Sequence, residues 1–263
     1  MFVTIITDCN DTATAGRQLT RANSLFSCPA NLVGVDFNAD YQAAGNMIDM
    51  LDAAEGREGV LLVNVAPRSG KAKKWKNGTP FGFFYYKNTL VVTTVDGKTL
   101  SLVKKLGLTD KIRVFDIPTV MSEIPNKLDI YEGQVEYIIN TQFRSFEFLP
   151  RVAKWIWEKI ELPVDNMMID EVEDIEGQIW WVDNFGNCKT TFLPEEIGFE
   201  VGKEVQFKNL PAVKCYAKLK DVPNGDPALV VGSSGIEGKR FVEFLVQGGS
   251  AANKYGLKVG DLL

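Results

Sequence analysis

Two patterns in the sequence predict an α/β N-terminal domain with a mostly parallel central sheet, followed by a small all-β C-terminal barrel. Up to about residue 160, continuous apolar runs alternate with segments of helical periodicity, as in a sheet covered on both faces. From about residue 165, short apolar runs follow one another between Gly, Pro and Asn, which is typical of a β-barrel. The length of 263 residues is enough for two hydrophobic cores. We therefore predict an α/β domain at 1–160, a linker at 161–168 and a β-barrel at 169–263.

The elements of the N-terminal domain follow from this alternation. Apolar runs predict the strands, and Lys87-Asn88 is predicted to turn between two of them in a hairpin. Apolar residues at helical spacing predict the helices, as at Val152, Trp155 and Ile156. The predicted strands are Phe2–Thr7, Asn31–Phe37, Val60–Val65, Phe81–Tyr86 and Thr89–Thr94, and the predicted helices are Thr12–Leu25, Tyr41–Ala54, Thr99–Leu106 and Phe148–Glu158.

Composition and charge exclude several classes of function. The net charge of −5 argues against a nucleic-acid surface, which needs concentrated Lys and Arg. No apolar run approaches ~20 residues, so no membrane span is expected. The first seven residues, MFVTIIT, lack the basic start of a secretory signal. Four cysteines without metal-type spacing predict reduced thiols, and hence a cytoplasmic protein.

The chain contains no histidine. This rules out Ser-His-Asp and Cys-His catalytic groups and any histidine-based metal site. We therefore predict no metal site, and we assign acid–base chemistry to carboxylates, lysines, tyrosines or thiols.

The segment Ile179 to Phe192, IWWVDNFGNCKTTF, carries the strongest functional signal. A buried strand at Ile179–Val182 is followed by a turn in which Gly186 supplies backbone freedom. The turn presents Asp183 and Asn187 on either side of Phe185. A carboxylate can hold an ammonium group, and a carboxamide can bond a neighbouring carboxylate or backbone group, so the pair suits a zwitterionic ligand. The alternative interpretation is an ordinary hairpin turn.

Two carboxylates follow the first predicted strand. Asp8 and Asp11 lie between that strand and the next helix, where open α/β sheets bind their ligands. Both can accept hydrogen bonds from a ribose diol. In the alternative interpretation Asp11 caps the helix and Asp8 belongs to a strand-end turn.

Three further segments are candidates for the same site. The turn at 66–70, APRSG, exposes Ser69 for hydrogen bonding. Thr141 to Arg144 precede the last N-terminal helix and include Phe143. Small residues at 232–235 and at 248–252, among them Gly248 and Ser250, would let backbone approach a planar ligand or would form hairpin turns.

Taken in order, these motifs resemble the S-adenosyl-L-methionine (SAM) hydroxide adenosyltransferase family, which includes SAM-dependent fluorinases and chlorinases. The motifs that match are VDNFGN at 182–187, GSSG at 232–235, GGSAANKYGLKVGD at 248–261, ITD with Asp11, APRSG at 66–70 and the segment from Thr141 through Pro150. The resemblance implies a homotrimer with SAM between the N-domain of one subunit and the C-domain of its neighbour.

The resemblance also implies the roles of the site residues. Asp8 and Asp11 lie by position around the ribose, with Asp11 as the diol ligand. Asp183 and Asn187, on either side of Phe185, hold the methionine moiety. The backbone from Gly248 to Ser250 lies by the adenine, and Thr141 and Phe143 line the cleft. In such enzymes a nucleophile attacks the ribose 5′ carbon and methionine leaves. No cofactor is implied beyond SAM itself.

The chain departs from the family at the chemical centre. Water-using members carry an Asp and a His where this chain has Ala66 and Phe143. Halogenating members carry a Tyr at the first of these positions and a hydroxyl residue three further on, which Ser69 retains. Arg144 replaces a small residue of the halide pocket. The loop between Asp8 and Asp11 is two residues shorter.

Two functions follow from this pattern. The first is an enzyme that cleaves SAM at the 5′ carbon with water or an anion as nucleophile, supported by Ser69 and Arg144. It would release methionine with adenosine or a 5′-substituted adenosine. The second is a catalytically inactive sensor or scaffold that binds SAM or an adenosyl compound. A third hypothesis is that the protein shares the fold of this family but binds an unrelated ligand.

Overall fold

The structure is a computed structural model that describes the chain except residues 38, 66–78, 125–126, 129 and 209. The chain divides into two compact units, Met1–Glu173 and Asp174–Leu263. The first unit is an α/β fold and the second is built mainly of antiparallel strands.

The N-terminal unit is organised around a seven-stranded mixed sheet of order β2-β1-β3-β5-β4-β6-β7. Pairing is parallel from β2 through β5 and antiparallel from β5 through β4 and β6 to β7. Every residue of β3 is buried, as expected for a strand covered on both faces. The strands are β1 Phe2–Thr7, β2 Ala30–Gly34, β3 Gly59–Asn64, β4 Phe81–Tyr86, β5 Thr89–Thr94, β6 Lys111–Val114 and β7 Asp165–Met168.

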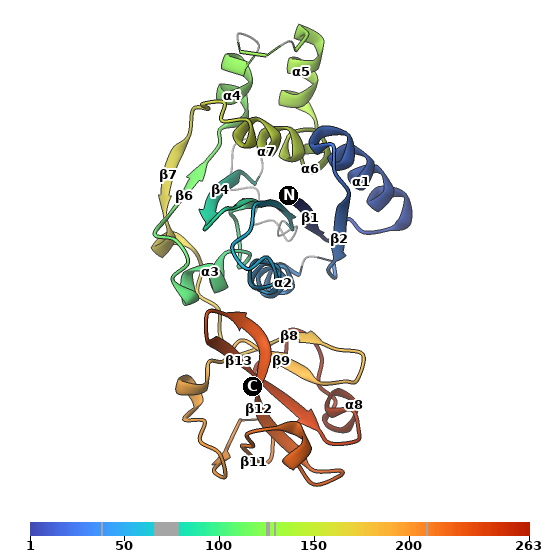
Figure 1. Cartoon of the computed structure of the whole chain (residues 1–263), viewed down its shortest axis with the longest axis vertical. Helices are drawn as coiled ribbons and strands as arrows, with labels where there is room; N and C mark the ends of the chain where they lie inside the picture. Colours follow the sequence, from blue (N-terminus) through green and yellow to red (C-terminus); the bar gives the residue numbers. More distant parts are fainter. Residues whose placement is uncertain (38, 66–78, 125–126, 129, 209) are drawn as a thin grey trace. The chain divides into compact units, whose positions relative to one another are not determined.

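Helices cover both faces of this sheet (Figure 1). On one face, α1 and α7 pack with Ala22, Phe26, Val152 and Ala153 against apolar side chains of the strands. On the other face lie α2 and α3, which contact each other. The helices are α1 Thr12–Phe26, α2 Asp40–Ala53, α3 Ser101–Leu106, α4 Ile117–Glu123, α5 Glu132–Asn140, α6 Arg144–Glu147 and α7 Leu149–Trp157.

The structure corrects the predicted linker. Asp165–Met168, which we placed in a linker, forms β7 and pairs with β6 from Lys111↔Met168 to Val114↔Asp165. Most side chains of β7 are exposed, so no apolar run marks it in the sequence, and pairing with a distant strand creates it. A short 3₁₀ turn at Ile169–Glu171 follows within the same unit.

The C-terminal unit contains a four-stranded antiparallel sheet of order β12-β13-β9-β8 and a separate two-stranded ladder of β10 and β11. This is a β region distinct from the α/β unit, and its closure into a barrel stays a prediction. Its elements are β8 Ile179–Val182, β9 Cys188–Thr190, β10 Glu204–Val205, β11 Val213–Lys214, β12 Pro227–Ile236, β13 Lys239–Val246, α8 Ala251–Tyr255 and 3₁₀ turns at Pro194–Ile197 and Leu219–Asp221.

The C-terminal unit has its own core. Ile179, Cys188, Val242 and Phe244 are fully buried, and Ala251 of α8 packs against the same cluster. The start of α8 is thereby held against the sheet that carries the β8–β9 turn. No helix in the described part of the chain is long and apolar enough to span a membrane.

Candidate ligand-binding site

The β8–β9 turn is organised by the carboxylate of Asp183. Its Oδ1 accepts hydrogen bonds from the backbone amides of Phe185, at 2.8 Å, and Asn187, at 2.9 Å. Its Oδ2 accepts one from Asn187 Nδ2 at 2.9 Å. The Asp183 amide in turn donates to the Asn187 carbonyl at 3.0 Å. The predicted pair therefore forms one hydrogen-bonded unit, with the carboxylate already oriented before a ligand arrives.

The β8–β9 turn contacts the start of α8 at Gly186 and Ser250, and we call this contact the clasp. Gly186 has φ +80°, and a Cβ built there would lie 1.9 Å from Ser250 Oγ. The Ala252 amide donates to the Gly186 carbonyl at 3.0 Å. Ser250 caps α8, since its Oγ accepts from the Asn253 amide at 3.1 Å, and its hydroxyl proton can still be donated. Two segments distant in the sequence are thus held in contact.

A pocket of about 660 Å³ opens beside this clasp. The structure places around it five residues predicted from the sequence, Asp183, Phe185, Asn187, Gly248 and Ser250. Their roles in binding a ligand stay predictions. The volume lies within the range of small-molecule sites, which is about 300–1,000 Å³.

Gly249 lies within the predicted backbone stretch from Gly248 to Ser250, whereas three other lining residues, Leu219, Val246 and Gln247, were not among the predicted site residues. Val246 and Gln247 directly precede Gly248, so their position at the end of a strand was a usable signal. Leu219 lies in a 3₁₀ turn almost thirty residues earlier and is brought to the pocket by the fold alone. No sequence pattern marks it.

The pocket combines one carboxylate, two carboxamides and exposed apolar surface. Phe185 is 78% exposed and Leu219 is 45% exposed, so both present apolar surface that a ligand in the pocket can contact. The backbone of Gln247 is anchored, because its amide donates to the Asp226 carbonyl and its carbonyl accepts from the Gly225 amide. This arrangement can hold an ammonium group at one point and a flat apolar body beside it.

Cys188, directly after this turn, is predicted to be chemically inert. Burial, followed by the negative charges of Asp183 and Asp261, raises the pKa of its thiol to about 12. Since the thiolate is the reactive form, iodoacetamide at pH 8 should not modify Cys188 in the folded protein. Peptide mass spectrometry should find it alkylated only after denaturation. Modification of native Cys188 at the rate of a free thiol would contradict this account.

In the N-terminal unit, Asp11 acts as the N-cap of α1. Its Oδ1 accepts from the amides of Ala13 and Thr14, both at 3.1 Å. Hydrogen bonds from Thr14, first by its side chain and then by its amide, lower the pKa of Asp11. The capping alternative is therefore realised, and a ribose-binding role would have to use the acceptor capacity that the cap leaves over.

The neighbouring loop has one internal hydrogen bond and is anchored to other segments at two points. The Cys9 thiol donates to Asp8 Oδ1 at 3.6 Å, and the Cys9 carbonyl accepts from Gln18 Nε2 at 2.7 Å. Asn10 Nδ2 donates to the Val35 carbonyl at 2.9 Å, which ties the loop to the segment after β2. Asp8 is thereby held at the carboxyl end of β1, where it was predicted.

Two substitutions of Asp11 should separate its structural and binding roles. Asparagine is an equally good N-cap, so Asp11→Asn should preserve thermal stability near neutral pH, whereas Asp11→Ala should lower it. Because the carboxyl pKa is lowered on folding, the ionised cap stabilises the native state above the unfolded pKa, and this is lost as pH falls through the folded value. If the carboxylate also binds a ligand, calorimetry should show weaker SAM binding in Asp11→Asn at unchanged melting temperature. Unchanged affinity would leave the cap as its sole function.

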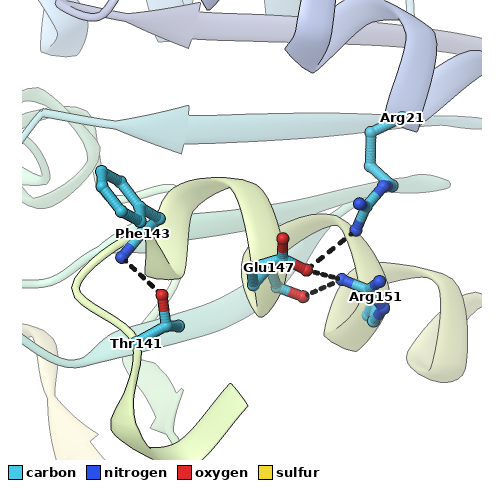
Figure 2. Close-up of polar contacts among 5 residues, drawn as sticks. All are labelled: Arg21, Thr141, Phe143, Glu147 and Arg151. Carbon is cyan, nitrogen blue, oxygen red and sulfur yellow. Dashed lines mark hydrogen bonds and ion pairs between the residues drawn. The ribbon is translucent and has the colours of Figure 1, made fainter. Parts of the chain in front are cut away.

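The segment before α6 is a compact turn rather than an open loop (Figure 2). The Phe143 amide donates to Thr141 Oγ1 at 3.0 Å, and the Phe143 side chain is 68% exposed. Arg144 is the first residue of α6, and burial lowers the pKa of its guanidinium. The three predicted residues thus lie next to one another at the start of α6.

Behind this turn lies an ion-pair network that the sequence analysis missed (Figure 2). Glu147 is buried, and its Oε2 accepts from Arg151 at 2.6 Å and from Arg21 at 3.1 Å. Arg17 and Arg21 of α1 also lie over the ring of Phe146, at 4.5 Å and 4.2 Å from its centroid. These contacts fix α6 against α1. The i,i+4 spacing of Glu147 and Arg151 was a signal for one of the two pairs.

The remaining predicted site residue, Ser69, lies outside the described residues, as does Ala66. Within the part of the chain that the structure describes, no cluster of three or more Cys, Asp or Glu side chains could hold a metal ion.

Comparison with known proteins identifies the C-terminal region. Residues 177–263 match the model of the SAM hydroxide adenosyltransferase C-terminal domain. Residues 177–263 belong to the SAM hydroxide adenosyltransferase family. All nine residues around the 660 Å³ pocket fall within this SAM hydroxide adenosyltransferase domain.

A curated relative agrees with this assignment. The chain is 33% identical over 103 residues to the (R)-S-adenosyl-L-methionine hydrolase of Thermus thermophilus. The match covers 38% of this chain and 36% of the hydrolase, so it spans little more than a third of either protein.

Solved structures share the fold over nearly the whole chain. The crystal structure of an uncharacterized conserved protein from Thermotoga maritima superposes with a TM-score of 0.68 at 16% identity, covering 99% of this chain and 98% of that one. A conserved hypothetical protein from Thermus thermophilus superposes with a TM-score of 0.59 at 18% identity, covering 98% and 97%. At this identity the likeness shows the fold alone.

Proposed function

We propose that this protein binds SAM and cleaves it at the ribose 5′ carbon, with water as the nucleophile and methionine and adenosine as products. The observation that carries the proposal is the pocket around Asp183, Phe185, Asn187, Gly248 and Ser250. It lies in a domain of the SAM hydroxide adenosyltransferase family. The hydrolase name of the Thermus thermophilus relative supports the same chemistry.

In this proposal Asp183 holds the methionine ammonium. Its carboxylate accepts three N–H bonds within the turn, so it does not have to reorganise when the ligand binds. Asn187 contributes by fixing that carboxylate, because its Nδ2 donates to Asp183 Oδ2. The exposed ring of Phe185 and the glycine backbone at Gly248 would contact the flat parts of SAM.

The chemical step is a displacement at carbon. The oxygen of water forms a bond to the 5′ carbon while the bond from that carbon to sulfur breaks, and its electron pair goes to the sulfonium. Methionine leaves as a neutral thioether, and the water releases one proton to solvent. Because the sulfonium is already a good leaving group, positioning and exclusion of bulk water can supply much of the rate.

The proposal assigns supporting roles to residues of the N-terminal unit. Asp8 and Asp11 would accept hydrogen bonds from the ribose, and Thr141 and Phe143 would line the cleft. Ser69 and Arg144 would orient the nucleophile. Since Ala66 and Phe143 replace the Asp and His of water-using family members, the reaction would be slow by about 10²–10⁴-fold for want of a general base.

We also propose that the chain works as a homotrimer. The basis is the family resemblance, in which neighbouring subunits share each site. Light scattering coupled to size-exclusion chromatography should give three times the mass of 29.2 kDa for the full chain. A monomer that still binds SAM would overturn the trimer proposal but not the proposed SAM pocket.

The test of function is a chromatographic assay of purified protein with SAM, with and without chloride. Equal amounts of adenosine and methionine, lost in Asp183→Ala, would support the hydrolase. Chlorinated adenosine that increases with chloride concentration would show that an anion, rather than water, is the nucleophile. SAM bound without any product would show the inactive binding protein instead. Absence of both binding and products would overturn the assignment.

A further inference from the structure

A second groove lies in the N-terminal unit, and none of its lining residues is among those assigned above to SAM. It has a volume of about 380 Å³ and runs between β4, β6 and the segment that follows α7. All of its lining residues fall between Phe83 and Val164, within one compact unit. Its volume is sufficient for a small organic molecule, and the proposed SAM chemistry gives it no task.

One wall of the groove is aromatic. Phe83 is buried and stacks on Phe115, with ring centroids 5.3 Å apart and an angle of 15° between the planes. Tyr85 meets the edge of Phe83 at 6.3 Å and 85°, and is 47% exposed. The lining residues also include aliphatic ones, among them Ile156 and Leu162. Such a slot favours a flat apolar body.

The polar groups at the groove are mainly cationic. The guanidinium of Arg113 lies over the Phe83 ring at 5.6 Å from its centroid. Neither Arg113 nor Lys159 forms an ion pair within the described part of the chain. The charged residues that line the groove are Arg113, Lys159 and Glu161, so their net charge is +1. Burial raises the pKa of Tyr85, so its hydroxyl remains a hydrogen-bond donor at neutral pH.

Lys159 also has an unusual backbone conformation. Lys159 adopts φ +62° at the end of α7, a left-handed conformation in which glycine is the unstrained residue. The geometry is set by two closing hydrogen bonds, from the Lys159 amide to the Ile156 carbonyl and from the Ile160 amide to the Trp155 carbonyl, both at 2.9 Å. Lys159 is also one of the residues that line the groove.

We propose that this groove binds a small monoanion with a flat apolar body, of the aromatic carboxylate class. The carboxylate would be held between Arg113 and Lys159, and the ring would lie in the slot beside Phe83 and Tyr85. A single negative charge matches the net +1 of the groove, and the planar guanidinium matches the two oxygens of a carboxylate.

The first test uses indole-3-acetate as the probe and the full chain, in isothermal titration calorimetry. We expect saturable binding at or below about 1 mM. Arg113→Met keeps an apolar stem but removes the charge, and should weaken binding about 10-fold or more. The matched control is Lys111→Met, which removes the same charge from the same strand outside the groove and should leave the affinity unchanged.

The second test separates binding from stability. Lys159→Gly should weaken indole-3-acetate binding several-fold while the melting temperature stays equal or rises, because glycine relieves the left-handed backbone. A role confined to ending α7 would leave the probe affinity unchanged and would overturn the proposed use of the amine.

Three outcomes would overturn the site as a whole. One is no saturable binding of the probe. Another is weakening of probe binding by Asp183→Asn rather than Arg113→Met, which would place the probe in the other pocket. The last is a change in molar mass of Arg113→Met by light scattering, which would show that a second copy of the chain covers the groove.

Discussion

Asp183→Asn is expected to weaken SAM binding by about 10- to 100-fold. The substitution keeps the shape of the side chain but removes the charge that would face the SAM ammonium in the proposed site, and a charge-assisted hydrogen bond contributes about 1.5–3 kcal/mol. It also sets the new amide against Asn187 Nδ2, which now donates to Asp183 Oδ2 at 2.9 Å. Calorimetry with SAM gives the affinity, and the chromatographic assay gives the turnover.

Two further variants make this result specific. Asp226→Asn removes an equal charge from an exposed carboxyl outside the pocket and should leave SAM affinity unchanged. The exchange D183N/N187D restores a donor–acceptor pair in the turn but moves the charge. We expect it to recover the melting temperature without recovering SAM affinity. Full affinity in Asp183→Asn, or in the exchange, would remove Asp183 from the proposed ammonium site.

Gly186→Ala should destabilise the C-terminal unit by more than about 2 kcal/mol. An alanine at φ +80° costs about 1 kcal/mol in backbone strain. Its Cβ would also lie 1.9 Å from Ser250 Oγ and 2.5 Å from Ser250 Cβ, so the turn and α8 must move apart. That movement opens the clasp that positions Asp183, and SAM affinity should fall with stability. Urea unfolding and calorimetry measure the two effects.

The control for this prediction is Gly238→Ala. Gly238 has φ +84°, close to that of Gly186, but a Cβ there meets nothing within 4 Å. It should therefore cost only the strain of about 1 kcal/mol, and SAM affinity should be unchanged. Equal losses of stability in both variants would show that contact with Ser250 contributes nothing.

Elements with a strong local pattern were predicted accurately. β1, β4 and β5 begin and end at the predicted residues, because each is a continuous apolar run and Lys87-Asn88 marks the hairpin turn. Elements without such a pattern were missed. β6, α4, α5 and α6 did not appear in the sequence analysis, and β7 was placed in a linker. These are short or lie at an exposed sheet edge, where tertiary pairing outweighs propensity.

The candidate site shows the same division. Residues 183–187 could be proposed as a functional turn because their hydrogen bonds connect neighbours in the chain. The cap at Asp11 was likewise one of two stated alternatives. Leu219 and the second partner of Glu147, Arg21, could not be found this way, since each reaches its position only when distant segments pack together.

By itself the sequence determined three things: the division into an α/β unit and a β unit, the absence of histidine chemistry, and the turn that orients Asp183. Each depends on composition, periodicity or hydrogen bonds that connect a few neighbouring residues. Only the tertiary structure decided that α8 contacts the β8–β9 turn and that Leu219 lines the pocket beside it. It also decided that Arg113 and Lys159 share a groove. These contacts join residues tens of positions apart, and their free energy comes from burial in a common core rather than from local pattern.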